Sequence, residues 1–173
     1  MFNYKFITSI DASMFRHKLP KVKKDWDKFK WRQETFTVHK KTKTIPLIFD
    51  KDGRIDNPTY HINYDIFKSE IEYLKDVYNT HIGSGFIIRA ILVNLPAKSK
   101  IDNHIDDGIT LNLCSRTHIP IITNEDVLFT INGEEKNLKE GEIWEINNSH
   151  KYHSVVNKGR EDRIHLIVDW MKA

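Results

Sequence analysis

Histidine and aspartate residues in the second half of the chain have the spacing of metal ligands. His104 and Asp106 form an H-x-D motif, and a further histidine, His153, follows much later. Two histidines and one carboxylate can hold one face of a ferrous ion and leave the opposite face open for chemistry. Residues i and i+2 of an extended segment share a face, so the motif suits a strand or a strand end. His104, Asp106 and His153 are therefore predicted as metal ligands and catalytic residues, with His153 arriving from a neighbouring strand.

Asp106 and His153 each have an alternative nearby in the sequence. Asp107 follows Asp106 directly, but at i+3 from His104 it would point to the other face of a strand. His150 precedes His153 in a polar turn, whereas His153 opens an alternating strand. These patterns favour Asp106 and His153. The scattered remaining histidines are interpreted as structural or surface residues: His17, His39, His61 and His81.

The H-x-D motif is weak by itself, but four further blocks follow it, at residues 115–121, 141–147, 153–157 and 163–169. In this order and at these separations the five blocks resemble the aspartyl/asparaginyl β-hydroxylase family. That family is a branch of the 2-oxoglutarate and Fe(II)-dependent oxygenases. The resemblance covers roughly residues 86–170, with weaker similarity around residues 31–47.

The resemblance implies a hydroxylase that uses Fe(II), 2-oxoglutarate and O2. It assigns Arg163 to the distal carboxylate of 2-oxoglutarate, and a guanidinium suits this role because it can fork onto a carboxylate. Arg116 and His118, at i and i+2, match family positions that line the co-substrate pocket near its metal-proximal end. His165 shares a strand face with Arg163 and either lines the pocket or packs as a hydrogen-bonded histidine.

Hydrophobic periodicity predicts one clear helix, over residues 63–78. Phe67, Ile71, Leu74 and Tyr78 form a single apolar stripe along it, so the helix should pack against a sheet. Before the helix, the patterns predict a short edge strand over residues 2–7, a helical turn or two over residues 11–17, and strands over residues 31–38 and 42–49.

After Gly85 the chain is rich in short β patterns, and Asn132-Gly133 is typical of a type I′ hairpin turn. No helical pattern separates these strands. The expected fold is therefore mainly β (α+β): a double-stranded β-helix, the cupin-like jelly roll, with N-terminal strands and at least one supporting helix. One domain over residues 1–173, with its jelly-roll core at about 86–170, fits the length of the chain.

Composition narrows the class of protein. Cys114 is the single cysteine, which excludes an internal disulfide framework and suits a reducing cytoplasm. Residues 1–10 lack a secretion signal, and no stretch has membrane-spanning length. The net charge of +3 gives no indication of a nucleic-acid partner, and the lysines between Lys18 and Lys30 suit a solvated surface. The expected partner is a small-molecule or peptide substrate, contacted by the N-terminal segment and residues 107–114.

Two functions follow from these observations. The first is an Fe(II)- and 2-oxoglutarate-dependent hydroxylase acting on an amino-acid side chain, either free or within a peptide or protein. The second is a non-catalytic jelly-roll module that binds a small ligand or a protein, because the same architecture can serve both roles. A zinc site fits less well, because structural zinc takes four protein ligands.

Overall fold

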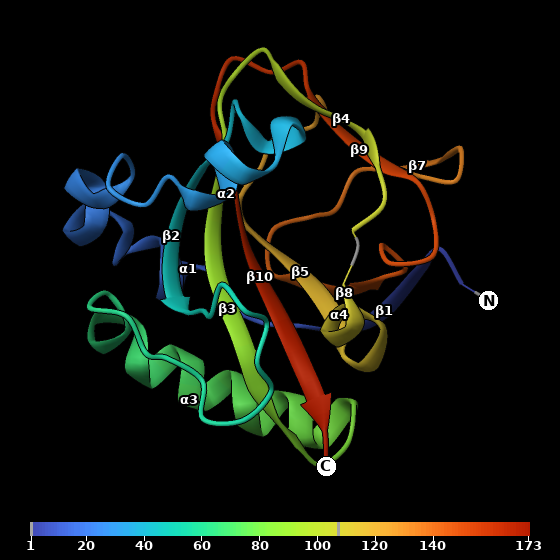
Figure 1. Cartoon of the computed structure of the whole chain (residues 1–173). Helices are drawn as coiled ribbons and strands as arrows, with labels where there is room; N and C mark the ends of the chain where they lie inside the picture. Colours follow the sequence, from blue (N-terminus) through green and yellow to red (C-terminus); the bar gives the residue numbers. More distant parts are fainter. Residues whose placement is uncertain (1, 107) are drawn as a thin grey trace.

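Two antiparallel β-sheets form the body of the computed structural model, which describes residues 2–106 and 108–173 (Figure 1). The strands are β1 (Tyr4–Ser9), β2 (Lys43–Ile48), β3 (Gly85–Leu95), β4 (Ser99–His104), β5 (Ser115–Ile122), β6 (Val127–Ile131), β7 (Glu134–Lys136), β8 (Glu142–Ile146), β9 (His153–Asn157) and β10 (Arg163–Lys172). The helices are α1 (Ser13–Arg16), η1 (Leu19–Asp25), α2 (Trp31–Thr35), η2 (Thr37–His39), α3 (Tyr64–His81) and α4 (Ile109–Leu113).

The strand order agrees with the predicted jelly roll. The larger sheet runs β1-β8-β5-β10-β3-β2, and the smaller runs β4-β9-β6-β7. Their inner faces share an apolar cluster in which Leu95 and Ile146 of the larger sheet join Phe129 and Val155 of the smaller one. The mainly β fold is thereby confirmed.

The predicted helix is present as α3, which packs on β2 and β3 of the larger sheet (Figure 1). Phe67, Ile71, Leu74 and Tyr78 are fully buried, as the apolar stripe predicts. The Tyr78 hydroxyl also forms a hydrogen bond with the Thr117 hydroxyl of β5, which ties the helix to the middle of the sheet. Among the described residues, no helix is long and apolar enough to cross a membrane.

The turn between β6 and β7 confirms the hairpin prediction. Asn132 and Gly133 have φ values of 49° and 82°, the left-handed conformations that a type I′ turn requires. At the other end of the chain, β1 forms the edge of the larger sheet next to β8, where the sequence predicts an edge strand.

The strand predicted over residues 31–38 is wrong, because this segment forms α2 and η2. Its β-type alternation spans only a few residues, and tertiary contacts override it. In the helical turn, the Gln33 side-chain amide donates hydrogen bonds to the hydroxyls of Thr42 and Thr44, at 3.1 and 3.0 Å. The segment therefore lies against the start of β2, and η2 contacts β4 of the smaller sheet.

Candidate functional site

The H-x-D motif lies where β4 ends, beside the first residue of β9. His104 is the last residue of β4, and its direct cross-strand partner is His153. The two rings have centroids 4.2 Å apart. Asp106 follows the strand, and its carboxylate lies 3.4 Å from Nε2 of His104 and 4.0 Å from Nε2 of His153. The structure thus brings the three predicted ligands together, with His153 on a neighbouring strand.

Both histidine rings are oriented by the same kind of backbone contact. Nδ1 of His104 lies 2.7 Å from the Asp102 carbonyl, and Nδ1 of His153 lies 3.4 Å from the Lys151 carbonyl. A carbonyl only accepts, so Nδ1 carries the proton and the Nε2 lone pair remains for a metal. Nε2 of His104 is indeed buried without a hydrogen-bond partner. Burial also lowers the pKa of His153 to about 4, which keeps this ring neutral at neutral pH.

The Asp106 carboxylate is held ionised by its neighbours. Burial raises its pKa, but the Arg116 guanidinium and the two histidines outweigh burial and hold the pKa well below its usual range. Oδ2 accepts hydrogen bonds from Nη1 of Arg116, at 2.6 Å, and from the Asn148 amide. The other oxygen, Oδ1, lies 3.4 Å from Nε2 of His104. Two imidazole nitrogens and one ionised carboxylate are donors that suit Fe(II).

Arg116 joins this carboxylate to a second, fully buried one. Its Nε and Nη2 each donate to Asp169 at 2.7 Å, while Nη1 donates to Asp106. Arg89 lies 3.4 Å from Asp169 on the far side. The four groups form a buried chain of alternating charge. A guanidinium has five N–H donors, so Arg116 keeps two of them for other partners.

Arg163, in contrast, has no acidic partner. Only 1% of the residue is exposed, and no carboxylate of the described residues lies within salt-bridge distance. Its Nη2 donates to Nδ1 of His165 at 2.6 Å, and its Nε has no partner. Burial alone lowers its pKa to about 9, so the guanidinium remains a cation. Because an uncompensated buried charge is costly, this position suits the anionic group of a bound molecule.

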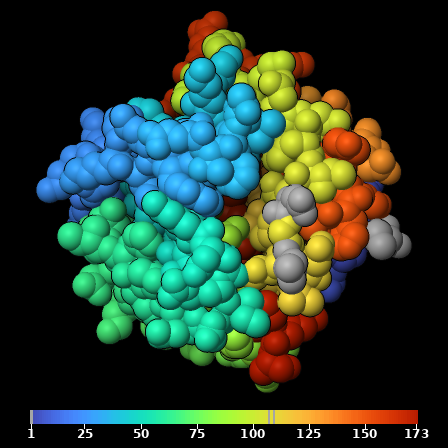
Figure 2. Space-filling view, viewed as in Figure 1, coloured from blue at the N-terminus to red at the C-terminus, as the bar shows by residue number. Residues whose placement is uncertain are grey.

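One cavity connects the metal-ligand end with the Arg163 end. The six side chains predicted as site residues all line it: His104, Asp106, Arg116, His118, His153 and Arg163. His165 is not among the lining residues; it packs behind Arg163, with its ring 5.7 Å from that of His118. Figure 2 shows a narrow hollow between the N-terminal part of the chain, in blue and cyan, and the yellow segment near residue 110.

The volume of this cavity is only about 30 Å³. Larger grooves lie elsewhere. One of about 560 Å³ lies between the α2–η2 segment and the start of β2, and one of about 470 Å³ lies between the lysine-rich segment before α2 and residues 61–66. Neither contains the convergent histidines and carboxylate that could hold a metal, so the small cavity is the better candidate for chemistry.

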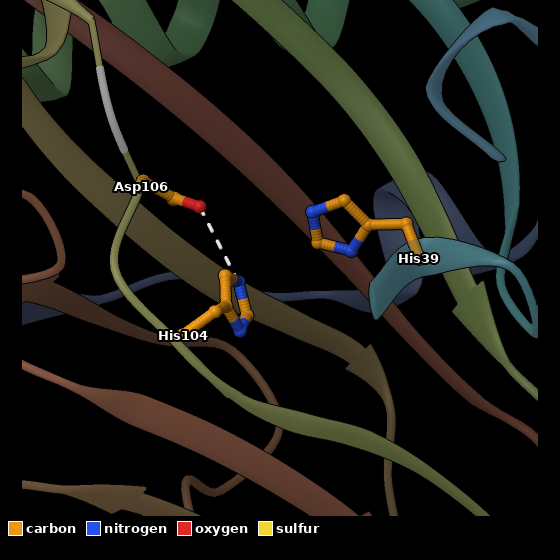
Figure 3. A group of neighbouring side chains, drawn as sticks. All are labelled: His39, His104 and Asp106. Carbon is orange, nitrogen blue, oxygen red and sulfur yellow. Dashed lines mark ion pairs between the residues drawn. The ribbon is translucent and has the colours of Figure 1, made fainter. Parts of the chain in front are cut away.

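The structure adds His39, which the sequence interpretation placed among the structural and surface histidines. It ends η2, is buried, and lines the same cavity. Ligand atoms of His39, His104 and Asp106 all lie within 4.8 Å of one another, and Figure 3 shows the His39 ring directed toward the other two. The weaker family similarity around residues 31–47 was the one signal that pointed to this segment. Arg32, from α2, also lines the cavity.

The two competing ligands are also accounted for. His150 is exposed, and its Nδ1 lies 2.9 Å from the Ser149 hydroxyl. It does not line the cavity that contains His153. Asp107 lies outside the described residues.

Solved structures with the same fold have little sequence identity to the chain. A 2OG-Fe(II) oxygenase family oxidoreductase from Burkholderia pseudomallei aligns with a TM-score of 0.60 at 14% identity, over 76% of this chain and 67% of that one. A Pseudomonas putida prolyl-4-hydroxylase gives 0.56 at 10% identity, over 99% and 93%. The viral collagen prolyl hydroxylase of Paramecium Bursaria Chlorella virus-1 gives 0.57 at 9% identity, over 99% and 97%. At these identities the likenesses show the jelly-roll fold alone.

A family model provides the sequence-level relationship. No curated protein sequence matches the chain. The model described as aspartyl/asparaginyl beta-hydroxylase, however, matches residues 12–173, nearly the whole chain, and confirms the resemblance seen in the sequence blocks. The chain therefore belongs to the aspartyl/asparaginyl β-hydroxylase family of 2-oxoglutarate- and Fe(II)-dependent hydroxylases.

Proposed function

We propose that the protein hydroxylates a carbon of an amino-acid side chain, either free or within a peptide or protein, with 2-oxoglutarate and O2 as co-substrates. The substrate C–H becomes C–OH, and 2-oxoglutarate becomes succinate and CO2. One oxygen atom of O2 enters the new hydroxyl group, and the other enters succinate. The bound Fe(II) supplies the oxidising chemistry, and the residues of the chain bind, orient and shield the reactants.

The observation that carries this proposal is the buried Arg163 guanidinium, which faces the cavity with the candidate metal ligands and has no acidic partner in the part of the chain that the structure describes. A dicarboxylate bound through one end at the metal would place its other end in such a cavity. Nη2 is oriented by His165, and the unpaired Nε is available for a forked contact with a carboxylate. A module that only binds a ligand would not need both a cluster of metal ligands and an unpaired guanidinium at the two ends of one cavity.

His104, Asp106 and His153 are proposed to hold the ion, as their oriented Nε2 atoms and ionised carboxylate support. Arg116 is proposed to position Asp106 through its bond to Oδ2 and to offer its remaining N–H groups to the co-substrate. His118, also in the cavity wall, is the other proposed co-substrate contact.

Apolar side chains complete the walls between the two ends: Val93, Ile101, Val155 and Ile167. They keep water from the bound reactants, so the charged contacts act in a low dielectric. Such shielding also protects a reactive oxidant from side reactions.

Arg163→Ala provides the test. Truncating the partner of a buried carboxylate costs about 2–5 kcal/mol, and about 1.4 kcal/mol corresponds to a factor of ten. The variant should therefore raise the Kd for 2-oxoglutarate at least about thirtyfold while Mn(II) affinity stays near wild type. Calorimetry on Mn(II)-loaded protein measures both constants. Arg163→Lys should rescue only partly, because lysine lacks the fork.

Arg160 provides a matched control, because it is exposed and lies three residues before Arg163, in the loop that leads into β10. Arg160→Ala should bind 2-oxoglutarate normally. Succinate formation from 2-oxoglutarate with Fe(II) and ascorbate then tests turnover. Mass spectrometry of amino acids and peptides for a gain of one oxygen identifies the substrate. If the wild type bound no 2-oxoglutarate, the binding-module hypothesis would replace this proposal.

A further inference from the structure

The α2–η2 segment contains one buried side chain, and that side chain is polar. α2 has no buried residue, and His39 is the buried residue of η2. The segment is attached to β2 through side-chain hydrogen bonds, such as those of Gln33 and Arg32 with the Thr44 hydroxyl. Two half-buried side chains, Trp31 and Val38, supply its apolar contacts with the sheets. Segments with few buried apolar contacts open at a smaller cost in free energy than core strands. The α2–η2 segment can therefore move at a smaller cost than a strand of either sheet.

His39 is buried at a position where it could bind a metal ion together with other residues of the site. Its ligand atoms lie within 4.8 Å of those of His104 and Asp106, and its ring faces them in Figure 3. Its Nδ1 is buried without a hydrogen-bond partner. A buried polar atom without a partner is destabilising. An ion shared with His104 and Asp106 would give this buried ring a polar partner through its other nitrogen.

His39 nevertheless differs from the other two histidines of the site. Nδ1 of His104 and of His153 each lies beside a backbone carbonyl, which fixes the ring with Nε2 toward the ion. Histidines that stay on a metal usually have such an acceptor behind them. No such acceptor holds Nδ1 of His39 among the described residues. His39 is thus suited to be a weaker and exchangeable ligand.

The cavity in this conformation is too small for the co-substrate. Its volume of about 30 Å³ is far below the roughly 300–1,000 Å³ of small-molecule sites. Most of its lining comes from strands of the two sheets, whereas His39 and Arg32 come from the α2–η2 segment. Movement of that segment would enlarge the cavity for 2-oxoglutarate without separating the two sheets.

We propose that His39 is a removable third histidine ligand: in the closed conformation it binds the same ion as His104 and Asp106, and it leaves with the α2–η2 segment when the co-substrate enters. The inference rests on the proposed function for the identity of the ion and the co-substrate. An octahedral ion held by two histidines and a carboxylate keeps one face free. A third histidine ligand would take one position on that face, so the closed site would not hold 2-oxoglutarate and dioxygen together.

Proton NMR of the Co(II)-loaded protein without O2 counts the bound histidines. Each metal-bound imidazole retains one exchangeable N–H, which gives one strongly shifted signal. The wild type should show three such signals, and His39→Ala should show two. Addition of 2-oxoglutarate should reduce the wild-type count to two and leave the variant unchanged.

Calorimetry provides the second measurement. His39→Ala should bind Mn(II) about tenfold more weakly, in the range by which groups around a site alter metal affinity. Once loaded with Mn(II), it should bind 2-oxoglutarate severalfold more tightly than the wild type, because no ligand has to leave. His39→Gln should behave in the same way and retains the bulk of the side chain. His150→Ala, at the exposed histidine, provides the control and should match the wild type in both constants.

The outcomes separate this inference from the proposed function. Two signals in both the wild type and His39→Ala, with normal 2-oxoglutarate binding, would overturn the inference and leave the proposed function intact. Three signals that persist in the wild-type complex with 2-oxoglutarate would overturn the release of His39. Three signals without any binding of 2-oxoglutarate would support His39 as a ligand of a closed site and contradict the hydroxylase proposal.

Discussion

The Asp106 carboxylate depends on residues that do not touch the candidate metal position. Asp169 is fully buried and accepts two hydrogen bonds from Arg116, which in turn donates to Oδ2 of Asp106. Burial raises the pKa of Asp169, but Arg116 and Arg89 outweigh it and lower that pKa, so both carboxylates are ionised. Asp169 thus holds Arg116 in place, and through Arg116 it orients the Asp106 carboxylate.

We predict that Asp169→Asn lowers Mn(II) affinity about tenfold, because partners behind a ligand typically alter metal affinity by about 10–100-fold. Without the second carboxylate, Arg116 is free to turn its fork onto Asp106 and draw Oδ1 away from the ion. Calorimetry measures the change. Asp76→Asn, on the exposed side of α3, is the control. Equal affinities in the wild type and Asp169→Asn would show that Arg116 keeps its position without Asp169.

At the residue scale the sequence allowed much of the cluster to be predicted, because local rules apply to it. The i, i+2 spacing brought His104 and Asp106 to one side, and the alternating pattern after His153 indicated a strand. His39 could not be found in this way. Its approach to His104 depends on how α2 and η2 fold against β2, and no local pattern encodes a contact between residues so far apart in the chain.

Arg116 illustrates a second limit of the sequence. The resemblance assigned it to the co-substrate pocket, and it does line the cavity. Its bonds to Asp106 and Asp169 could not be foreseen, because Asp169 comes beside Arg116 only through the register of β10 with β5. The register between two strands that lie far apart in the chain cannot be predicted from any short stretch of sequence.

Among the elements, α3 shows where sequence prediction is strongest. A long amphipathic stripe specifies both the helix and its buried face, and the burial of Phe67, Ile71, Leu74 and Tyr78 agrees with it. The segment over residues 31–38 shows the opposite case. Its short alternation carried little information, so side-chain contacts of Gln33 with Thr42 and Thr44 decided its conformation.

We predict that Leu74→Ala destabilises the fold without changing the candidate site. Truncating a fully buried leucine leaves a cavity and costs about 2–5 kcal/mol, and Leu74 is fully buried beneath α3. Because α3 packs on β2 and β3 rather than on the metal ligands, Mn(II) affinity should stay at the wild-type value. Urea unfolding and calorimetry measure the two quantities.

Lys68→Ala, on the exposed side of the same helix, should leave the free energy of unfolding within about 0.5 kcal/mol of wild type. A loss of Mn(II) affinity in Leu74→Ala would mean that the helix supports the site through the sheet. That result would link α3 to function as well as to stability.

For the whole molecule, the concentration of buried histidines between the sheets has a consequence for stability. Burial is the first cause that lowers the pKa of each of four of them: to about 2 for His39, to about 4 for His153, and well below the usual range for His118 and His165. His104 differs, because Asp106 and the Asp102 carbonyl outweigh burial and raise its pKa. The folded protein thus binds fewer protons than the unfolded chain at mildly acidic pH.

The metal-free protein is therefore predicted to lose stability steeply as the pH falls below about 6.5, the unfolded histidine pKa. A histidine whose folded pKa is depressed contributes stability that is complete above the unfolded pKa and is lost as the pH falls toward the folded pKa. Below this pH His104 is protonated in both states, so the other four histidines set the slope. At about 1.4 kcal/mol for each proton, the free energy of unfolding should fall by at most about 5.4 kcal/mol per pH unit. Urea unfolding between pH 7.5 and 5 measures this slope, and replacement of the exposed His17 and His81 by glutamine should not change it. A free energy of unfolding that stayed constant over this range would mean that the buried rings take up protons in the folded state, and the neutral Nε2 donors proposed for the metal would then be lost as well.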